Sequence, residues 1–238
     1  MGTDFFLRHL LDGDSASNTL GWRWVAGLQT AVKTYLARPE NIEKYTQGRF
    51  CPTGLATEAA AAARASNPKR EFLPAIDPVD PALIIGLLMH EEDLDLGHIV
   101  GAGLTLTATA LLPRHSKPPL LETAPKVHGF TQKAQGDRLG RFDAQTQTCS
   151  TPKDLADLVQ WSHSNPLQQI ITPFAPVGEI ATHLSDAKRV LRPLGISLVP
   201  KMAPYDRLIW PRTAHGFFRF KDKIPSFIDQ IKTPQSMA

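Results

Sequence analysis

The sequence predicts a protein of mixed α and β structure, with a helical piece over residues 1–75 and an α/β region with a mainly parallel sheet over residues 76–238. Helical patterns fill the first 50 residues. An alanine-rich stretch, 56–65, follows and predicts an exposed helix or connector. Apolar runs typical of buried strands then alternate with helical patterns, which is the order found in parallel sheets.

Three short helices are expected in the helical piece. Residues 4–11 place apolar side chains on one side of a helix, and residues 18–28 form a second. Pro39 suits the first position of a third helix over 39–45, and acidic residues such as Glu40 favour its first turn. Because the alanine-rich stretch carries no large side chain to bury, we place the domain boundary close to residue 75.

The α/β region opens with a continuous apolar run, 82–89, which predicts a strand buried on both faces. The weakly polar run 99–112 has only 14 residues, short of the ~20 that cross a bilayer, so a buried element is expected there.

A helix begins with a pattern resembling a capping box at Thr151 and runs toward residue 164. Its expected apolar stripe consists of Leu155, Leu158, Val159 and Trp161. A strand over 168–172, a helix over 177–191 and a strand over 195–199 follow, which completes a βαβ pattern.

The composition excludes a disulfide scaffold and a zinc knuckle. Only two cysteines, Cys51 and Cys149, occur in 238 residues and they lie far apart, so reduced thiols in a cytosol are expected. The N-terminus lacks the features of a secretory signal, which predicts a cytoplasmic protein without a membrane partner. Residues 201–238 carry seven Lys/Arg against three Asp/Glu, a basic tail that suits phosphate but is more often a solvated surface.

Common catalytic motifs are absent from the sequence. It contains no G-x-G-x-x-G fingerprint, no Walker A loop and no G-x-S-x-G elbow. The eight histidines are scattered without a pair at i and i+4, so each is expected at the surface or as a cap rather than as a metal ligand.

Polar and aromatic groups are unusually dense in residues 12–27. The stretch contains two carboxylates, one amide and two indoles, which are Asp12, Asp14, Asn18, Trp22 and Trp24. Taken by themselves, the acids suit helix caps, the amide suits a turn, and the indoles suit a core.

The same residues carry a family resemblance. The pattern D-G-D-x-x-x-N-x-x-x-W-x-W-x-A-G, followed by Tyr35-Leu36 and by P-E-N-I at 39–42, resembles the C-terminal part of the FAD-binding helical domain of the DNA photolyase and cryptochrome family. The block from Phe5 to Phe50 carries this resemblance, roughly a fifth of the chain.

The resemblance implies FAD as cofactor and a role for each residue. Asp12 and Asp14 would contact the flavin, and Asn18 would stand opposite N5, where an uncharged carbonyl acceptor favours the reduced, protonated ring. Trp22 would be the nearest tryptophan in an electron-transfer chain, and Trp24 would line a cavity for a pyrimidine dimer flipped out of DNA. The implied activity is light-driven electron transfer from reduced FAD to damaged DNA, or flavin photoreduction for signalling.

The chain departs from the family's pattern in two ways. It begins inside the helical domain, without the loop that grips the flavin phosphates or the arginine that pairs Asp12, so weak or no FAD retention is expected, as is a second polypeptide supplying the other helical half. The α/β region, loosely similar to the family's antenna domain over 167–228, follows the helical piece, whereas the family places that domain first.

Two other functions fit the sequence. A non-catalytic interaction module would dock on a partner chain through the apolar side chains of Phe5, Phe6, Leu10 and the tryptophans. An α/β enzyme would have its active site after the strands that end near Met89 or Thr172, where open sheets bind ligands. The polar residues after the first of these strands, which by themselves indicate a turn, are His90, Glu91, Glu92 and Asp93.

Overall fold

The computed structural model describes residues 8–11, 36–58, 73, 77–100, 103–112, 122–142, 148–176, 178–213 and 217–232. The chain divides into two compact units, Met1–Arg70 and Glu71–Ala238. The mixed α and β class and the parallel sheet are as predicted.

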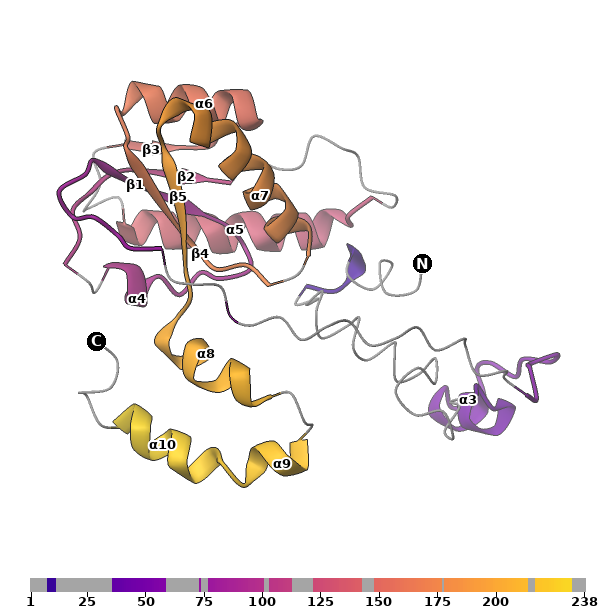
Figure 1. Cartoon of the computed structure of the whole chain (residues 1–238). Helices are drawn as coiled ribbons and strands as arrows, with labels where there is room; N and C mark the ends of the chain where they lie inside the picture. The colour runs from indigo at the N-terminus through magenta and orange to yellow at the C-terminus, as the bar shows by residue number, and fades with distance from the viewer. Residues whose placement is uncertain are drawn as a thin grey trace. The chain divides into compact units, whose positions relative to one another are not determined.

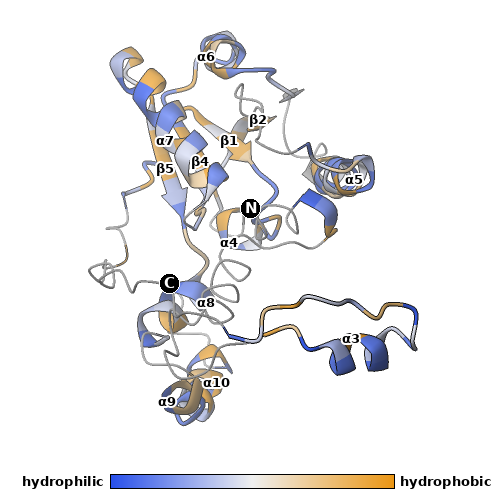
Figure 2. Ribbon diagram, turned by 90° about the vertical axis from the view of Figure 1, so that its right-hand side faces the viewer, coloured by the Kyte–Doolittle hydropathy of each residue, from blue (hydrophilic) through white to orange (hydrophobic). Residues whose placement is uncertain are grey.

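In the first unit, helix α3 spans Pro39–Tyr45, as its proline and acidic first turn predict (Figure 1). Gly48, at a φ of 74°, ends it by donating its N–H to the carbonyl of Glu43 at 2.8 Å. None of the side chains of α3 is buried, and the helix is mostly hydrophilic (Figure 2).

The other predicted helices of this unit fall largely on residues that the structure does not describe. Of 4–11, residues 8–11 are described: Arg8 and His9 are helical, and Leu10 is 44% exposed. The helix over 18–28 lies outside the described residues, and so does 59–65 of the alanine-rich stretch.

The second unit is built on a five-stranded sheet in the order β3-β2-β1-β4-β5, with every neighbouring pair parallel. The strands are β1 (Ile85–Met89), β2 (Leu106–Leu111), β3 (Thr148–Ser150), β4 (Gln169–Pro173) and β5 (Ser197–Lys201). All residues of β1 and β4 are buried, as expected for strands covered on both faces.

Helices cover both faces of the sheet (Figures 1 and 2). Helices α6 (Leu155–Ser164) and α7 (Glu179–Leu191) pack on one face against strand side chains such as Leu88 and Ile170. Helix α4 (Gly97–Val100) and Leu139 of α5 (Pro125–Phe142) pack on the other. Each large apolar side chain buried in these layers stabilises the fold by about 1.5–3 kcal/mol.

Two predicted elements need correction. The run 99–112 is not one element: it contains the end of α4 and then β2, and Gly103 between them adopts a left-handed φ of 69°. The strand predicted from residue 82 starts only at Ile85, because the Asp80 carboxylate accepts a hydrogen bond from the N–H of Ala82 at 2.9 Å and holds a turn there.

The cap of α6 also differs from the prediction. The N-cap is Asp154 rather than Thr151: its Oδ1 accepts a hydrogen bond from the N–H of Asp157 at 2.9 Å. The carboxylate of Asp157 in turn accepts from the N–H of Lys153 at 3.1 Å. Within the predicted stripe, Leu158 and Trp161 are buried.

Close packing between β1 and α6 depends on Gly86. A Cβ at this position would lie 2.5 Å from Cδ1 of Leu167 and 3.0 Å from the indole of Trp161. The first distance is shorter than real Cβ contacts and the second is at the tight limit, so a side chain here would force the end of Leu167 and the indole of Trp161 to shift.

Beyond β5 the described residues form three more α-helices, α8 (Pro204–Ile209), α9 (Phe217–Lys221) and α10 (Ile224–Lys232). Helix α10 contacts α8, and the rings of Phe220 and Phe227 lie 5.7 Å apart. We call residues 201–232 the C-terminal extension. Within the described part of the chain, no helix has both the length and the apolar character needed to cross a membrane.

Candidate functional site

The strand order reverses between β1 and β4, the two neighbouring central strands of the sheet. Helices α4 and α5, which follow β1 and β2, lie on one face, whereas α7, which follows β4, lies on the other. After β1 the chain therefore turns to one face of the sheet, and after β4 it turns to the opposite face. Open α/β sheets bind their ligands at this point, so the site is built from the residues that follow Met89 and Pro173.

His90 is the central polar group of this edge. Its side chain is 0% exposed, and Nε2 lies 3.0 Å from the carbonyl oxygen of Pro173. Because a carbonyl only accepts, Nε2 carries the proton, and Nδ1 of the neutral ring is an acceptor. Nδ1 is buried and has no hydrogen-bond partner among the described residues. Burial lowers the pKa of His90, although the Pro173 carbonyl and the nearby carboxylates of Glu91 and Asp93 oppose this shift.

The turn after His90 carries acids. Asp93 closes the turn by a β-bridge with His90, and its carboxylate accepts a hydrogen bond from the N–H of Asp95 at 3.0 Å. Burial raises the pKa of Asp93, and this hydrogen bond and the neighbouring histidines His98 and His90 lower it in part. The prediction that these polar residues form a turn is correct, and the turn holds a half-buried carboxylate next to a buried imidazole.

Helix α5 supplies a further polar contact. Nε2 of Gln135, a buried side chain, donates to the Glu91 carboxylate at 3.2 Å. Gln135 does not stand out in the sequence, because three glycines and a weak apolar pattern hide α5. A glutamine that contacts an acid from another element can be recognised as part of a site only when the position of its helix in the fold is known.

The carboxyl ends of β4 and β5 lie at the same edge of the sheet. The Lys201 carbonyl accepts from the N–H of Phe174 at 2.8 Å and lies 3.3 Å from Nε2 of His98. The Phe174 ring meets the ring of Trp210 edge to face, with centroids 5.8 Å apart. The C-terminal extension is thereby attached to the same edge of the sheet.

Histidines are not all at the surface or in caps, contrary to the expectation from the sequence. His90 and His183 are buried, with exposed fractions of 0% and 3%. His90 continues the alternation of β1 and therefore remains in the packed layers, although the sequence around it is polar.

Chemically, the edge offers an acceptor nitrogen, two carboxylates and an amide. A neutral histidine whose second nitrogen donates to a carbonyl is a suitable general base. Thr172 of β4 adds a buried hydroxyl without a hydrogen-bond partner among the described residues. In that part of the chain, no cluster of three or more His, Cys, Asp or Glu side chains is arranged to hold a metal ion.

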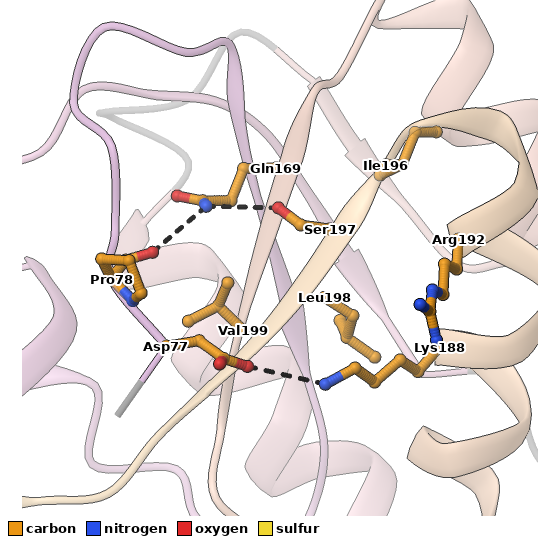
Figure 3. A pocket seen from close by; sticks show the side chains of 9 residues that line it. All are labelled: Asp77, Pro78, Gln169, Lys188, Arg192, Ile196, Ser197, Leu198 and Val199. Atoms are coloured by element: carbon orange, nitrogen blue, oxygen red, sulfur yellow. Dashed lines mark hydrogen bonds and ion pairs between the residues drawn. The ribbon is translucent and has the colours of Figure 1, made fainter. Parts of the chain in front are cut away.

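A hollow of about 350 Å³ lies beside the amino ends of β4 and β5 (Figure 3). Its lining residues are Asp77, Pro78, Gln169, Lys188, Arg192, Ile196, Ser197, Leu198 and Val199.

The polar groups that line this hollow bind the segment that precedes β1. Nε2 of Gln169 donates to the Pro78 carbonyl at 3.4 Å and to Oγ of Ser197 at 3.2 Å, and its Oε1 accepts from the N–H of Asp80 at 3.1 Å. Lys188 Nζ lies 3.5 Å from the Asp77 carboxylate (Figure 3). Since Gln169 is satisfied within the fold, we interpret this hollow as structural.

Five residues carry the resemblance to a flavin site in the sequence. Asp12, Asp14, Asn18, Trp22 and Trp24 all lie outside the described residues.

The strand order and the helices on both faces of the sheet define the second unit as a doubly wound α/β domain. No family model, no curated protein and no solved structure matches the chain.

Proposed function

We propose that the chain is a photolyase/cryptochrome-like flavoprotein, in which residues 12–24 contribute to an FAD site. The observation that carries the proposal is the pattern of Asp12, Asp14, Asn18, Trp22 and Trp24 at the family's spacing. A parallel α/β unit in the same chain also supports it, because the family combines its helical domain with an α/β antenna domain. The fold class is shared by many functions, so this support is secondary.

FAD supplies photochemical electron transfer when it is bound, and the protein's part is to hold and tune it. Asp12 and Asp14 are the proposed contacts of the flavin, and the Asn18 carboxamide offers an uncharged acceptor to a ring nitrogen. Trp22 is the proposed electron donor, and Trp24 gives an aromatic wall against which a flipped base can stack. The proposed substrate is a pyrimidine dimer in DNA, with light signalling as the alternative outcome of the same site.

Equilibrium dialysis of the chain against FAD tests the cofactor. We expect saturable but weak binding, and at least a tenfold loss in Asp12→Ala, because removal of a charged hydrogen-bond partner costs about 1.5–3 kcal/mol. Asp206→Ala, on α8, is the matched control and retains wild-type affinity. Loss of FAD during purification is expected of so weak a site, but the proposal is wrong if dialysis detects no FAD binding at all, or if both variants bind FAD as the wild type does.

A second candidate function is ligand binding or acid–base catalysis at the carboxyl edge of the sheet. The specific observation in its favour concerns Nδ1 of His90, which lies where the strand order reverses. This atom is buried and has no hydrogen-bond partner in the part of the chain that the structure describes. Thermal unfolding with AMP or FMN tests it, because open parallel sheets bind nucleotides there. A ligand-induced rise in Tm that is lost in His90→Gln and kept in His163→Gln supports this candidate, and no rise in any of the three proteins counts against it.

A further inference from the structure

The positive charge of the protein is concentrated in the C-terminal extension. Residues 201–232 carry seven Lys/Arg and three Asp, a net charge of +4, whereas the whole chain has +3 and the remainder therefore −1. Of the seven basic side chains, five are exposed, which are Arg212, Arg219, Lys221, Lys223 and Lys232.

Exposed aromatic rings accompany this charge. Phe217 and Phe218 open α9 with exposed fractions of 66% and 77%, and their centroids lie 5.9 Å apart. Lys221 Nζ lies 5.6 Å from the centroid of the Phe218 ring. The two adjacent rings and the cations beside them therefore form a small patch that is both aromatic and basic.

The apolar face of α10 is exposed only in part, and its most exposed large residue, Ile228, has an exposed fraction of 43%. Its central residue, Phe227, is 5% exposed and packs against Phe220 of α9. A bilayer would need a continuous apolar face, whereas the outer surface of α9 offers two rings interleaved with cations.

We propose that this surface, defined by Phe217, Phe218, Arg219, Lys221 and Lys223, binds single-stranded nucleic acid. Cations neutralise the phosphates, and the phenyl rings stack with bases, a combination that tolerates any sequence. This binding goes beyond the proposed flavin function, since it requires neither flavin nor light nor a damaged base.

Fluorescence anisotropy of a labelled oligothymidylate with the full chain tests the proposal. Raising the salt from 50 to 200 mM should weaken binding about 20- to 50-fold if three or four phosphates are contacted. Phe217→Ala with Phe218→Ala should weaken it at least tenfold at either salt concentration. Lys221→Gln with Lys223→Gln should instead reduce the slope of log affinity against log salt by about 1.4.

Helix α5 offers matched controls, because it also exposes one phenyl ring and two lysines. Phe130→Ala removes one exposed phenyl ring from α5, and Lys126→Gln with Lys133→Gln removes two exposed lysines; both variants should leave binding unchanged. The proposal is overturned if the α9 and α5 variants lose affinity equally, or if the affinity does not depend on salt. Binding of phosphatidylserine vesicles, but not of the oligonucleotide, through the same phenyl rings would also overturn it.

Discussion

The burial of His90 makes a quantitative prediction about stability and pH. Burial lowers the pKa of this imidazole from its ordinary 6.5, so the unfolded chain takes up a proton at a pH where the folded protein does not. Below pH 6.5 the unfolded state therefore binds more protons, and the free energy of unfolding falls as the pH falls, until His90 itself titrates in the folded state.

The size of the effect follows from linkage for one group. Protonation of the unfolded histidine alone removes up to about 1.4 kcal/mol of unfolding free energy between pH 7.5 and 5.5. His90→Gln retains a donor for the Pro173 carbonyl but does not titrate, so it should lose this part of the pH dependence. The raised pKa of Asp93 acts in the opposite direction and in a lower window, above its ordinary 3.8, where folding favours the protonated acid.

Urea unfolding at pH 7.5, 6.5 and 5.5 is the assay, with the difference between wild type and variant as the readout. His163→Gln, which removes an exposed histidine of α6, is the control and should retain the wild-type dependence. The reasoning is refuted if His90→Gln shows the full wild-type slope. It is also refuted if the wild type becomes more stable than His90→Gln as the pH falls, because His90 would then be charged in the folded state.

Two further predictions concern the packing of α6. Gly86→Ala should destabilise the second unit by about 1–3 kcal/mol, because the new Cβ meets the indole of Trp161 and the end of Leu167. Chemical denaturation measures this loss, and an unchanged midpoint would contradict the close packing. Asp154→Ala should lower the free energy of unfolding by about 1 kcal/mol, because it removes the acceptor for the Asp157 N–H. Asp154→Asn should restore most of this loss. Equal stability of both variants and the wild type would show that the cap is not formed.

The sequence predicts most of the sheet, and the reason is physical. Strands β1, β4 and β5 and helix α7 have strong apolar patterns, because both faces of the sheet are covered and each element must bury a face. The sequence does not indicate helix α5, because Gly129, Gly136 and Gly140 lower its helix propensity. In the fold, the burial of Val127, Gln135 and Leu139 outweighs this loss.

The site at the carboxyl edge was predicted only in outline. The sequence indicates that ligands would bind after Met89 or Thr172, but not that β1 and β4 are neighbours. The pairing of β1 with β4 brings His90 next to Pro173, which is 83 positions further along the chain. It also buries the imidazole of His90, although the neighbouring residues in the sequence are polar. Strand order is a long-range property, and local patterns carry little of it.

The central claim is that residues 12–24 cradle a flavin, and quenching of FAD fluorescence on addition of the chain tests it most directly. An indole next to the isoalloxazine quenches its emission by electron transfer, so we predict saturable quenching that is largely lost in Trp22→Phe and retained in Trp210→Phe. Quenching that is absent, or equal in both variants and the wild type, would contradict the claim, because the flavin would then have no defined place beside Trp22.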